Sequence, residues 1–108
     1  MKIGIVLSTN EPEAAWNAFR FGLMELSLGH DVKMFLLGKA VEIEDINEPK
    51  FNVVEKAQEY LEKGGEILVC STCLVSRGMK DDFKLSPPST MKDLADLVNN
   101  SDKVITFG

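Results

Sequence analysis

The chain has 108 residues, of which 44% are apolar and 27% are charged, with a formal net charge of −5. This size and balance are typical of one globular domain, so we expect residues 1–108 to form a single domain. The acidic balance and the lack of a basic cluster argue against nucleic acid as a partner. No apolar run approaches the roughly 20 residues that span a bilayer. Because the start is strand-like rather than a signal peptide, we expect a cytoplasmic protein with no membrane partner.

The first segments predict a strand followed by a helix. Lys2–Ser8 is too apolar for an exposed edge and predicts a buried strand. Asn10 is a good helix N-cap, and Pro12 is tolerated in a first turn, so we predict a helix from there to about Leu28. Apolar residues of this helix, Trp16 among them, cover more than one stripe. Such a helix needs a second surface to bury, which suggests self-association.

The middle of the chain repeats the alternation. Asp31–Leu37 predicts a second strand, and Gly38–Ala40 predicts a tight exit that leads into a short helical turn. Phe51–Lys63 has the amphipathic spacing of a helix. The apolar run Ile67–Val69 then predicts a third strand, buried on both faces as in a parallel sheet.

The last third holds an irregular stretch, a helix and a strand. Met79–Pro88 predicts an exposed loop, with one short strand near Phe83–Leu85. Ser89 or Thr90 caps the next helix. Its predicted buried face has apolar residues at i, i+3, i+4 and i+7: Met91, Leu94, Ala95 and Val98. Lys103–Phe107 predicts the final strand.

This order of elements predicts an α/β fold: a mostly parallel sheet of four or five strands between helices, in a three-layer α/β/α sandwich. Chemistry in such sheets gathers at the carboxyl ends of the strands. Four segments fall at that edge: Ser8–Glu11, Gly38–Ala40, Cys70–Cys73 and Phe107–Gly108. His30 falls at the opposite edge.

The stretch Glu66–Gly78 combines reactive chemistry with a strand-to-helix junction. Cys70 follows the third strand, and Ser71 and Thr72 are N-cap residues for a short helix that Gly78 ends. A thiol at a helix start faces free N–H groups and the positive end of the helix dipole. We therefore expect a lowered pKa and a nucleophilic thiolate at Cys70.

Several chemistries compete for this stretch. Cys70 and Cys73 form a Cys-x-x-Cys pair, which indicates a dithiol redox site, although the flanking residues of thioredoxin-type sites are missing. A metal site is not expected, because zinc needs about four ligands and the chain has two cysteines and one misplaced histidine. A cysteine phosphatase is excluded because Arg77 stands seven residues after Cys70 rather than six. In the structural interpretation, Cys70 is a small buried hydrophobe and the chain is a non-catalytic oligomeric module.

The stretch Cys70-Ser-Thr-Cys-Leu-Val-Ser-Arg-Gly78 resembles the DsrE/DsrF-like family, most of all its YchN-type members. The opening Lys2–Ser8, the second strand with its Gly38 exit, and the tail Ser101–Phe107 agree with this. The resemblance implies a flavodoxin-like sandwich that assembles as trimers or hexamers. It also implies a sulfur-relay role, in which a sulfurtransferase-type carrier without a cofactor receives sulfur from a donor protein and passes it to an acceptor. The loop Met79–Pro88 departs from the family pattern.

Carried over by position, the resemblance implies that Cys70 accepts sulfur as a persulfide, with Cys73 a second cysteine and Arg77-Gly78 the family's Arg-Gly pair. From its own chemistry, Arg77 is an anion partner, and Lys39 is a second cation at the same edge. Ser8 and Asn10 are placed to contact a small ligand. We expect four glutamates to be mostly solvated: Glu11, Glu13, Glu42 and Glu44.

Overall fold

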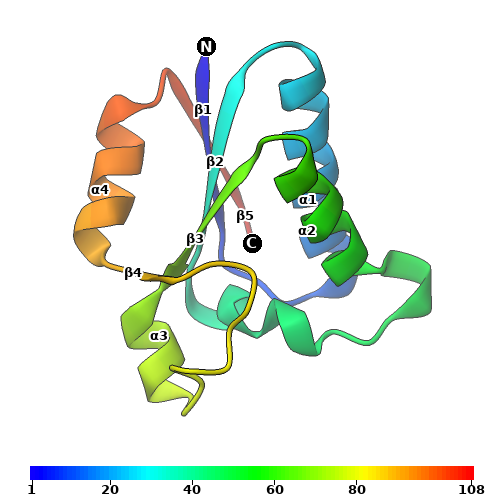
Figure 1. Ribbon diagram of the computed structural model, residues 1–108, viewed down its shortest axis with the longest axis vertical. Helices are drawn as coiled ribbons and strands as arrows, with labels where there is room; N and C mark the ends of the chain where they lie inside the picture. The colour runs from blue at the N-terminus through cyan, green and yellow to red at the C-terminus, as the bar shows by residue number, and fades with distance from the viewer.

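The computed structural model describes residues 1–108 and contains one five-stranded parallel sheet with helices on both sides (Figure 1). The elements are β1 (Lys2–Leu7), α1 (Pro12–Ser27), β2 (Asp31–Leu36), η1 (Gly38–Asp45), η2 (Pro49–Phe51), α2 (Val53–Glu62), β3 (Glu66–Cys70), α3 (Ser71–Ser76), β4 (Pro88–Ser89), α4 (Met91–Asn100) and β5 (Lys103–Phe107). The sheet order is β4-β3-β2-β1-β5, and every neighbouring pair is parallel. The predicted α/β/α sandwich is confirmed.

Helices α1 and α2 cover one face of the sheet, and α4 covers the other (Figure 1). The core lies mainly on the α1/α2 side, where Phe19 and Tyr60 pack edge to face with ring centroids 5.5 Å apart. The Tyr60 hydroxyl donates to the carbonyls of Val32 and Glu66, at 3.2 and 2.9 Å. A buried aromatic side chain thereby joins α2 to two strands. None of the helices combines the length and apolar character needed to cross a membrane.

Helix α4 buries a different face from the predicted one. Leu97 is its buried residue and lies against the backbone at Gly4, where an added Cβ would meet the Leu97 side chain at 2.6 Å. Met91 and Val98 are instead 61% and 45% exposed. The prediction is confirmed for Leu94, which packs partly buried against the core, and is wrong for the other three residues. Leu97 belongs to a neighbouring stripe of the same helix, and the approach of α4 to β1 buries that stripe.

The segment between α3 and α4 also differs from expectation. The short strand is Pro88–Ser89, paired with Val69 and Cys70, and not Phe83–Leu85. A two-residue edge strand tolerates proline, which lacks the N–H of an inner strand. Phe83 packs against the core.

Glu11 and Glu13 are exposed as expected, whereas Glu42 and Glu44 are half-buried. The Glu44 carboxylate accepts the backbone N–H groups of Lys84 and Leu85, at 2.8 and 2.9 Å. Glu11 rather than Asn10 caps α1, accepting the N–H of Ala14 at 2.8 Å. Two of the four glutamates therefore organise backbone, one in a loop and one at a helix start.

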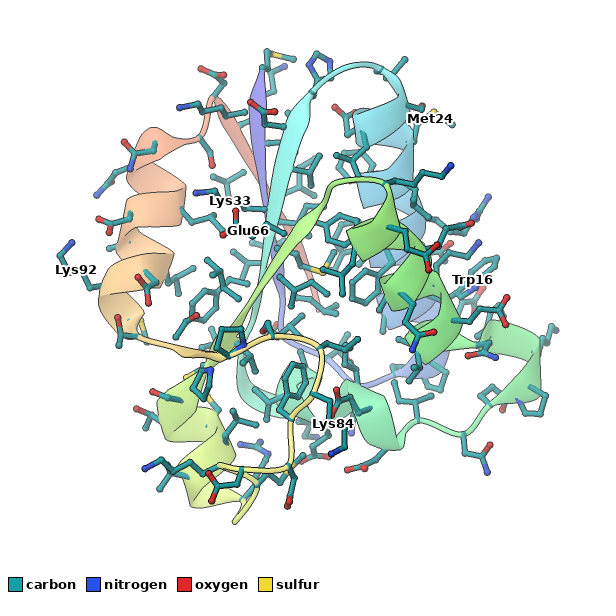
Figure 2. The ribbon with its side chains drawn as sticks, in the orientation of Figure 1. Trp16, Met24, Lys33, Glu66, Lys84 and Lys92 are labelled. Atoms are coloured by element: carbon teal, nitrogen blue, oxygen red, sulfur yellow. The ribbon has the colours of Figure 1, made fainter.

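Trp16 obtains its second surface within the chain. Its ring meets Phe51 of η2 at a centroid distance of 5.4 Å, and the cations of Arg20 and Lys56 lie over it at 4.7 and 5.7 Å. Figure 2 shows Trp16 on the outer side of the α1/α2 layer. The apolar residues of α1 that do not face the sheet are thus covered partly by η2.

Candidate functional site

Cys70 lies at the junction between β3 and α3, as the sequence predicts. It is the last residue of β3 and also the N-cap of α3, and its Sγ accepts the backbone N–H of Cys73 at 3.3 Å. Ser71 and Thr72 were the predicted caps. The chain instead enters the helix one residue earlier, so the sulfur takes the position of the capping oxygen and is held against the first turn.

Cys73 lies one helical turn later and is half-buried. Its Sγ accepts the backbone N–H of Gly38 at 3.3 Å. Gly38 follows β2 and has a φ of 58°, in the left-handed region that glycine adopts without strain. Both cysteines are free thiols. The first turn of α3 and the loop after β2 therefore each bring one backbone N–H group to a sulfur atom.

The electrostatic environment of Cys70 is opposite to the predicted one. Cys70 is 3% exposed, and burial raises the pKa of its thiol, with the Cys73 side chain raising that pKa further. The N–H groups of Cys73 and Thr72 lower the pKa, but by less than burial raises it. Helix α3 has only six residues, so its dipole is small and the desolvation of a thiolate outweighs it. The predicted lowering of the pKa is wrong.

Arg77 is held by Glu42 rather than left open to an anion. Its Nε donates to Glu42 Oε2 at 2.7 Å, and its Nη1 donates to the Cys73 carbonyl at 3.2 Å. The other Glu42 oxygen accepts the amide of Asn10 at 3.1 Å. Glu42, expected to be solvated, thus joins two predicted site residues from different segments. Because the carboxylate compensates the guanidinium charge, Arg77 braces α3 in this arrangement.

The other three predicted binding residues form no hydrogen bond with either sulfur. Ser8 Oγ donates to the carbonyl of Gly108 at 2.9 Å, and so joins the ends of β1 and β5. Lys39 is exposed. Gly78 has a φ of 65° and ends α3, where the Met79 N–H bonds to the Leu74 carbonyl at 2.9 Å. Gly78 therefore contributes by ending α3 in the left-handed conformation, and not by contacting a sulfur atom.

Sequence reasoning missed two contributors, the backbone N–H of Gly38 and the carboxylate of Glu42. Both follow β2, whose carboxyl end lies beside that of β3. The rule that chemistry gathers at this edge could have selected both, had it been applied to backbone donors and acidic side chains. No group of three His, Cys, Asp or Glu side chains gathers closely enough to hold a metal ion.

Comparison with known proteins identifies the family. The DsrE/DsrF-like family model matches residues 1–107. The uncharacterized protein MJ0989 of Methanocaldococcus jannaschii is 33% identical over 99% of this chain and 100% of its own length. The uncharacterized protein MK0008 of Methanopyrus kandleri is 33% identical over 88% of this chain and 83% of its own.

Solved structures show the same fold. The ychN protein from E. coli superposes with a TM-score of 0.84 at 24% identity, over 99% of both chains. The conserved protein of unknown function BT1422 from Bacteroides thetaiotaomicron gives 0.79 at 21% identity, over 97% of this chain and 93% of its own. The match of the family model over nearly the whole chain shows that this protein belongs to the DsrE/DsrF-like family.

Proposed function

We propose that this protein is a sulfur carrier, which holds sulfur as a persulfide at the Cys70–Cys73 pair and passes it to an acceptor. Sulfur relay is the general role of the family. The observation that carries the proposal is the pair of free thiols at the carboxyl edge, each accepting a backbone N–H at 3.3 Å. Persulfide transfer needs a thiolate nucleophile and no bound cofactor.

The surrounding residues have supporting roles in this proposal. Arg77 and Glu42 hold α3, and Gly78 ends it, so together they fix the helix that carries Cys73. The exposed Lys39 follows Gly38 directly and supplies a cation beside the loop that contacts Cys73. Ser8 and Asn10 shape the neighbouring loops through their hydrogen bonds to Gly108 and Glu42. A donor or acceptor protein would approach the half-buried residue Cys73 at this edge.

A dithiol redox protein is the second candidate, favoured by the spacing and contact of the two cysteines. Cys73 donates its N–H to the Cys70 sulfur, and residues three apart on one turn can close a disulfide. This function predicts a reversible disulfide with a defined reduction potential. It also predicts that replacing either cysteine abolishes the redox change, whereas a carrier keeps sulfur loading on the cysteine that remains reactive.

Intact-mass measurement tests the proposal. Reduced protein is incubated anaerobically with a small-molecule persulfide donor, the donor is removed, and the mass is recorded with time. A carrier gains about 32 Da, one sulfur atom, in the wild type or in a variant that keeps one cysteine, and a reductant removes it. The double variant Cys70→Ser/Cys73→Ser is the control and gains nothing. Failure of the wild type and of both single variants to gain sulfur would leave a non-catalytic module as the function.

A homo-oligomer, a trimer or hexamer, in the cytoplasm is part of the same proposal. Its support is the family resemblance, together with two exposed apolar side chains near the end of α1, Met24 and Leu28, which are 59% and 62% exposed. Figure 2 shows Met24 at the outer surface. Light scattering after size exclusion measures the assembly. A monomer at micromolar concentration would overturn this part and leave the sulfur chemistry untouched.

A further inference from the structure

The two cysteines differ in their access to solvent. Cys70 ends β3, pairs there with Ser89 of β4, and is 3% exposed. Cys73 lies on the first turn of α3 and is half-buried. A donor from outside the chain therefore reaches the Cys73 sulfur first. This is the reverse of the order expected from the sequence, in which Cys70 was the acceptor and Cys73 the secondary thiol.

We propose that the two thiols act in sequence: Cys73 takes the sulfane sulfur, and Cys70 then resolves the persulfide, releasing sulfide and leaving a Cys70–Cys73 disulfide. The inference rests on the proposed function, because it begins with a loaded persulfide. It adds a second outcome to sulfur carriage, namely reduction of the bound sulfur to sulfide by the chain's own thiols.

Each step balances in atoms and electrons. In the first, the Cys73 thiolate attacks the terminal sulfur of a donor R–S–SH. This forms Cys73–S–SH and releases RS⁻. In the second, Cys70 loses its proton to solvent and its thiolate attacks the Cys73 Sγ, the S–S bond to the terminal sulfur breaks, and HS⁻ leaves. The two cysteine sulfurs are oxidised to a disulfide while the sulfane sulfur is reduced to sulfide. A small dithiol reductant then restores both thiols.

The geometry favours the second step. The N–H of Cys73 donates to the Cys70 Sγ at 3.3 Å, so the Cys70 sulfur already lies against the residue that it would attack. The N–H of Gly38 fixes the Cys73 Sγ from the neighbouring loop at the same distance. Reaction between two groups on one helical turn of the same chain avoids the loss of translational freedom that an external thiol would incur. A buried Cys70 is shielded from outside reagents yet open to this one partner.

Arg77 and Glu42 hold the helix that carries Cys73 in place. The Arg77 Nη1 holds the Cys73 carbonyl at 3.2 Å, and Glu42 anchors the Arg77 Nε at 2.7 Å. Helix α3 is short and has few backbone hydrogen bonds of its own, so this brace limits its movement. The carboxylate does not contact either sulfur, and we place Glu42 and Arg77 as positioning residues.

Single-cysteine variants test the sequence of events. Reduced wild type, Cys70→Ser and Cys73→Ser are exposed to a persulfide donor without oxygen, freed of donor, and sampled for sulfide, intact mass and free thiols. Wild type should release about one sulfide per loaded chain and lose both thiols, with the mass falling about 2 Da below that of the reduced protein. Cys70→Ser should keep the added sulfur and release sulfide at least tenfold more slowly. Cys73→Ser should load at least tenfold more slowly than wild type.

Control variants separate chemistry from folding. Val75 is 56% exposed on the same helix, and Val75→Ala should load and release sulfide as the wild type does. Cys70→Ala repeats the test should the buried serine of Cys70→Ser unfold the chain, with circular dichroism confirming structure. Sulfide release that is unchanged in both Cys70 variants overturns the inference, as does a stable persulfide on wild type. In those cases loading still supports the carrier, whereas no loading in any variant overturns the carrier and the inference together.

Discussion

The two edges of the sheet differ in the open space and in the chemical groups that a ligand could contact. At the amino edge, an open hollow of about 400 Å³ lies between α4 and the starts of the strands, lined by charged residues such as Lys33, Glu66 and Asp96. Figure 2 shows Lys33 and Glu66 in the space between α4 and β3. The carboxyl edge holds the two thiols. The hollow has no cysteine in its lining, so in this molecule chemical groups, and not volume, indicate the candidate site.

The amino edge is built for stability. Tyr60 reaches it from α2, and its hydroxyl bonds to the carbonyls of Val32 and Glu66. Burial raises the pKa of the Tyr60 phenol far above its ordinary range, so the group stays a neutral donor at physiological pH. The carboxyl edge instead holds its polar groups around sulfur. The comparison predicts that changes at one edge alter stability and changes at the other alter reactivity.

The largest expected effect is the pH dependence of Cys70. Because burial raises its pKa, the thiol is protonated at neutral pH, and its thiolate fraction grows about tenfold for each pH unit below that pKa. In Cys73→Ser, alkylation of Cys70 by iodoacetamide should therefore speed up about 100-fold between pH 7 and pH 9. A rate that levels off below pH 8 would contradict the burial argument and restore the lowered pKa expected from the sequence.

The next largest effect is expected from disrupting the packing of Tyr60 at the amino edge. A Cβ at Gly65 would clash with three ring atoms of Tyr60, and a packed ring cannot move aside as a flexible chain end can. Gly65→Ala should lower the free energy of unfolding by about 1–3 kcal/mol, as overpacking does. Urea titration measures it, with the exposed Lys63→Ala as the control. The folded fraction should still load sulfur at the wild-type rate. A loss of loading in folded protein would show that packing at the amino edge influences the thiols at the carboxyl edge.

Sequence reasoning was most successful where the signal is local and repeated. Apolar runs and helix spacing gave the strands, the crossovers and the carboxyl-edge position of Cys70. It failed where a distant segment decides. The pKa of Cys70 depends on burial by packed neighbours such as β4, which pairs with Cys70 from the far side of a long loop. The buried stripe of α4 was equally non-local, because Leu97 and Met91 both have helical spacing and only the sheet distinguishes them. Glu42 was missed because its partner Arg77 is 35 residues away.

A smaller effect is expected from the brace at the carboxyl edge. Glu42→Gln removes the charge facing Arg77 while keeping a side chain that can accept a hydrogen bond. The pair is partly exposed, at 28% and 34% of the two side chains, so we expect a stability loss below about 1 kcal/mol. The uncompensated Arg77 should favour an anionic donor and raise the loading rate by less than about fivefold. Asp45→Asn, which removes an exposed like charge from the same η1, is the control, and an equal gain there would show a general charge effect.

The smallest expected effect comes from the hollow itself. Asp96 lines it and forms an ion pair with Lys92 at 3.1 Å, with side chains 52% and 82% exposed. Such exposed pairs contribute little, so Asp96→Asn should change the free energy of unfolding by less than about 0.5 kcal/mol. Sulfur loading should not change, because Asp96 lies at the amino edge and the thiols lie at the other. A tenfold change in loading with an unchanged melting curve would mean that the hollow communicates with the cysteines, and that volume and chemistry serve one site.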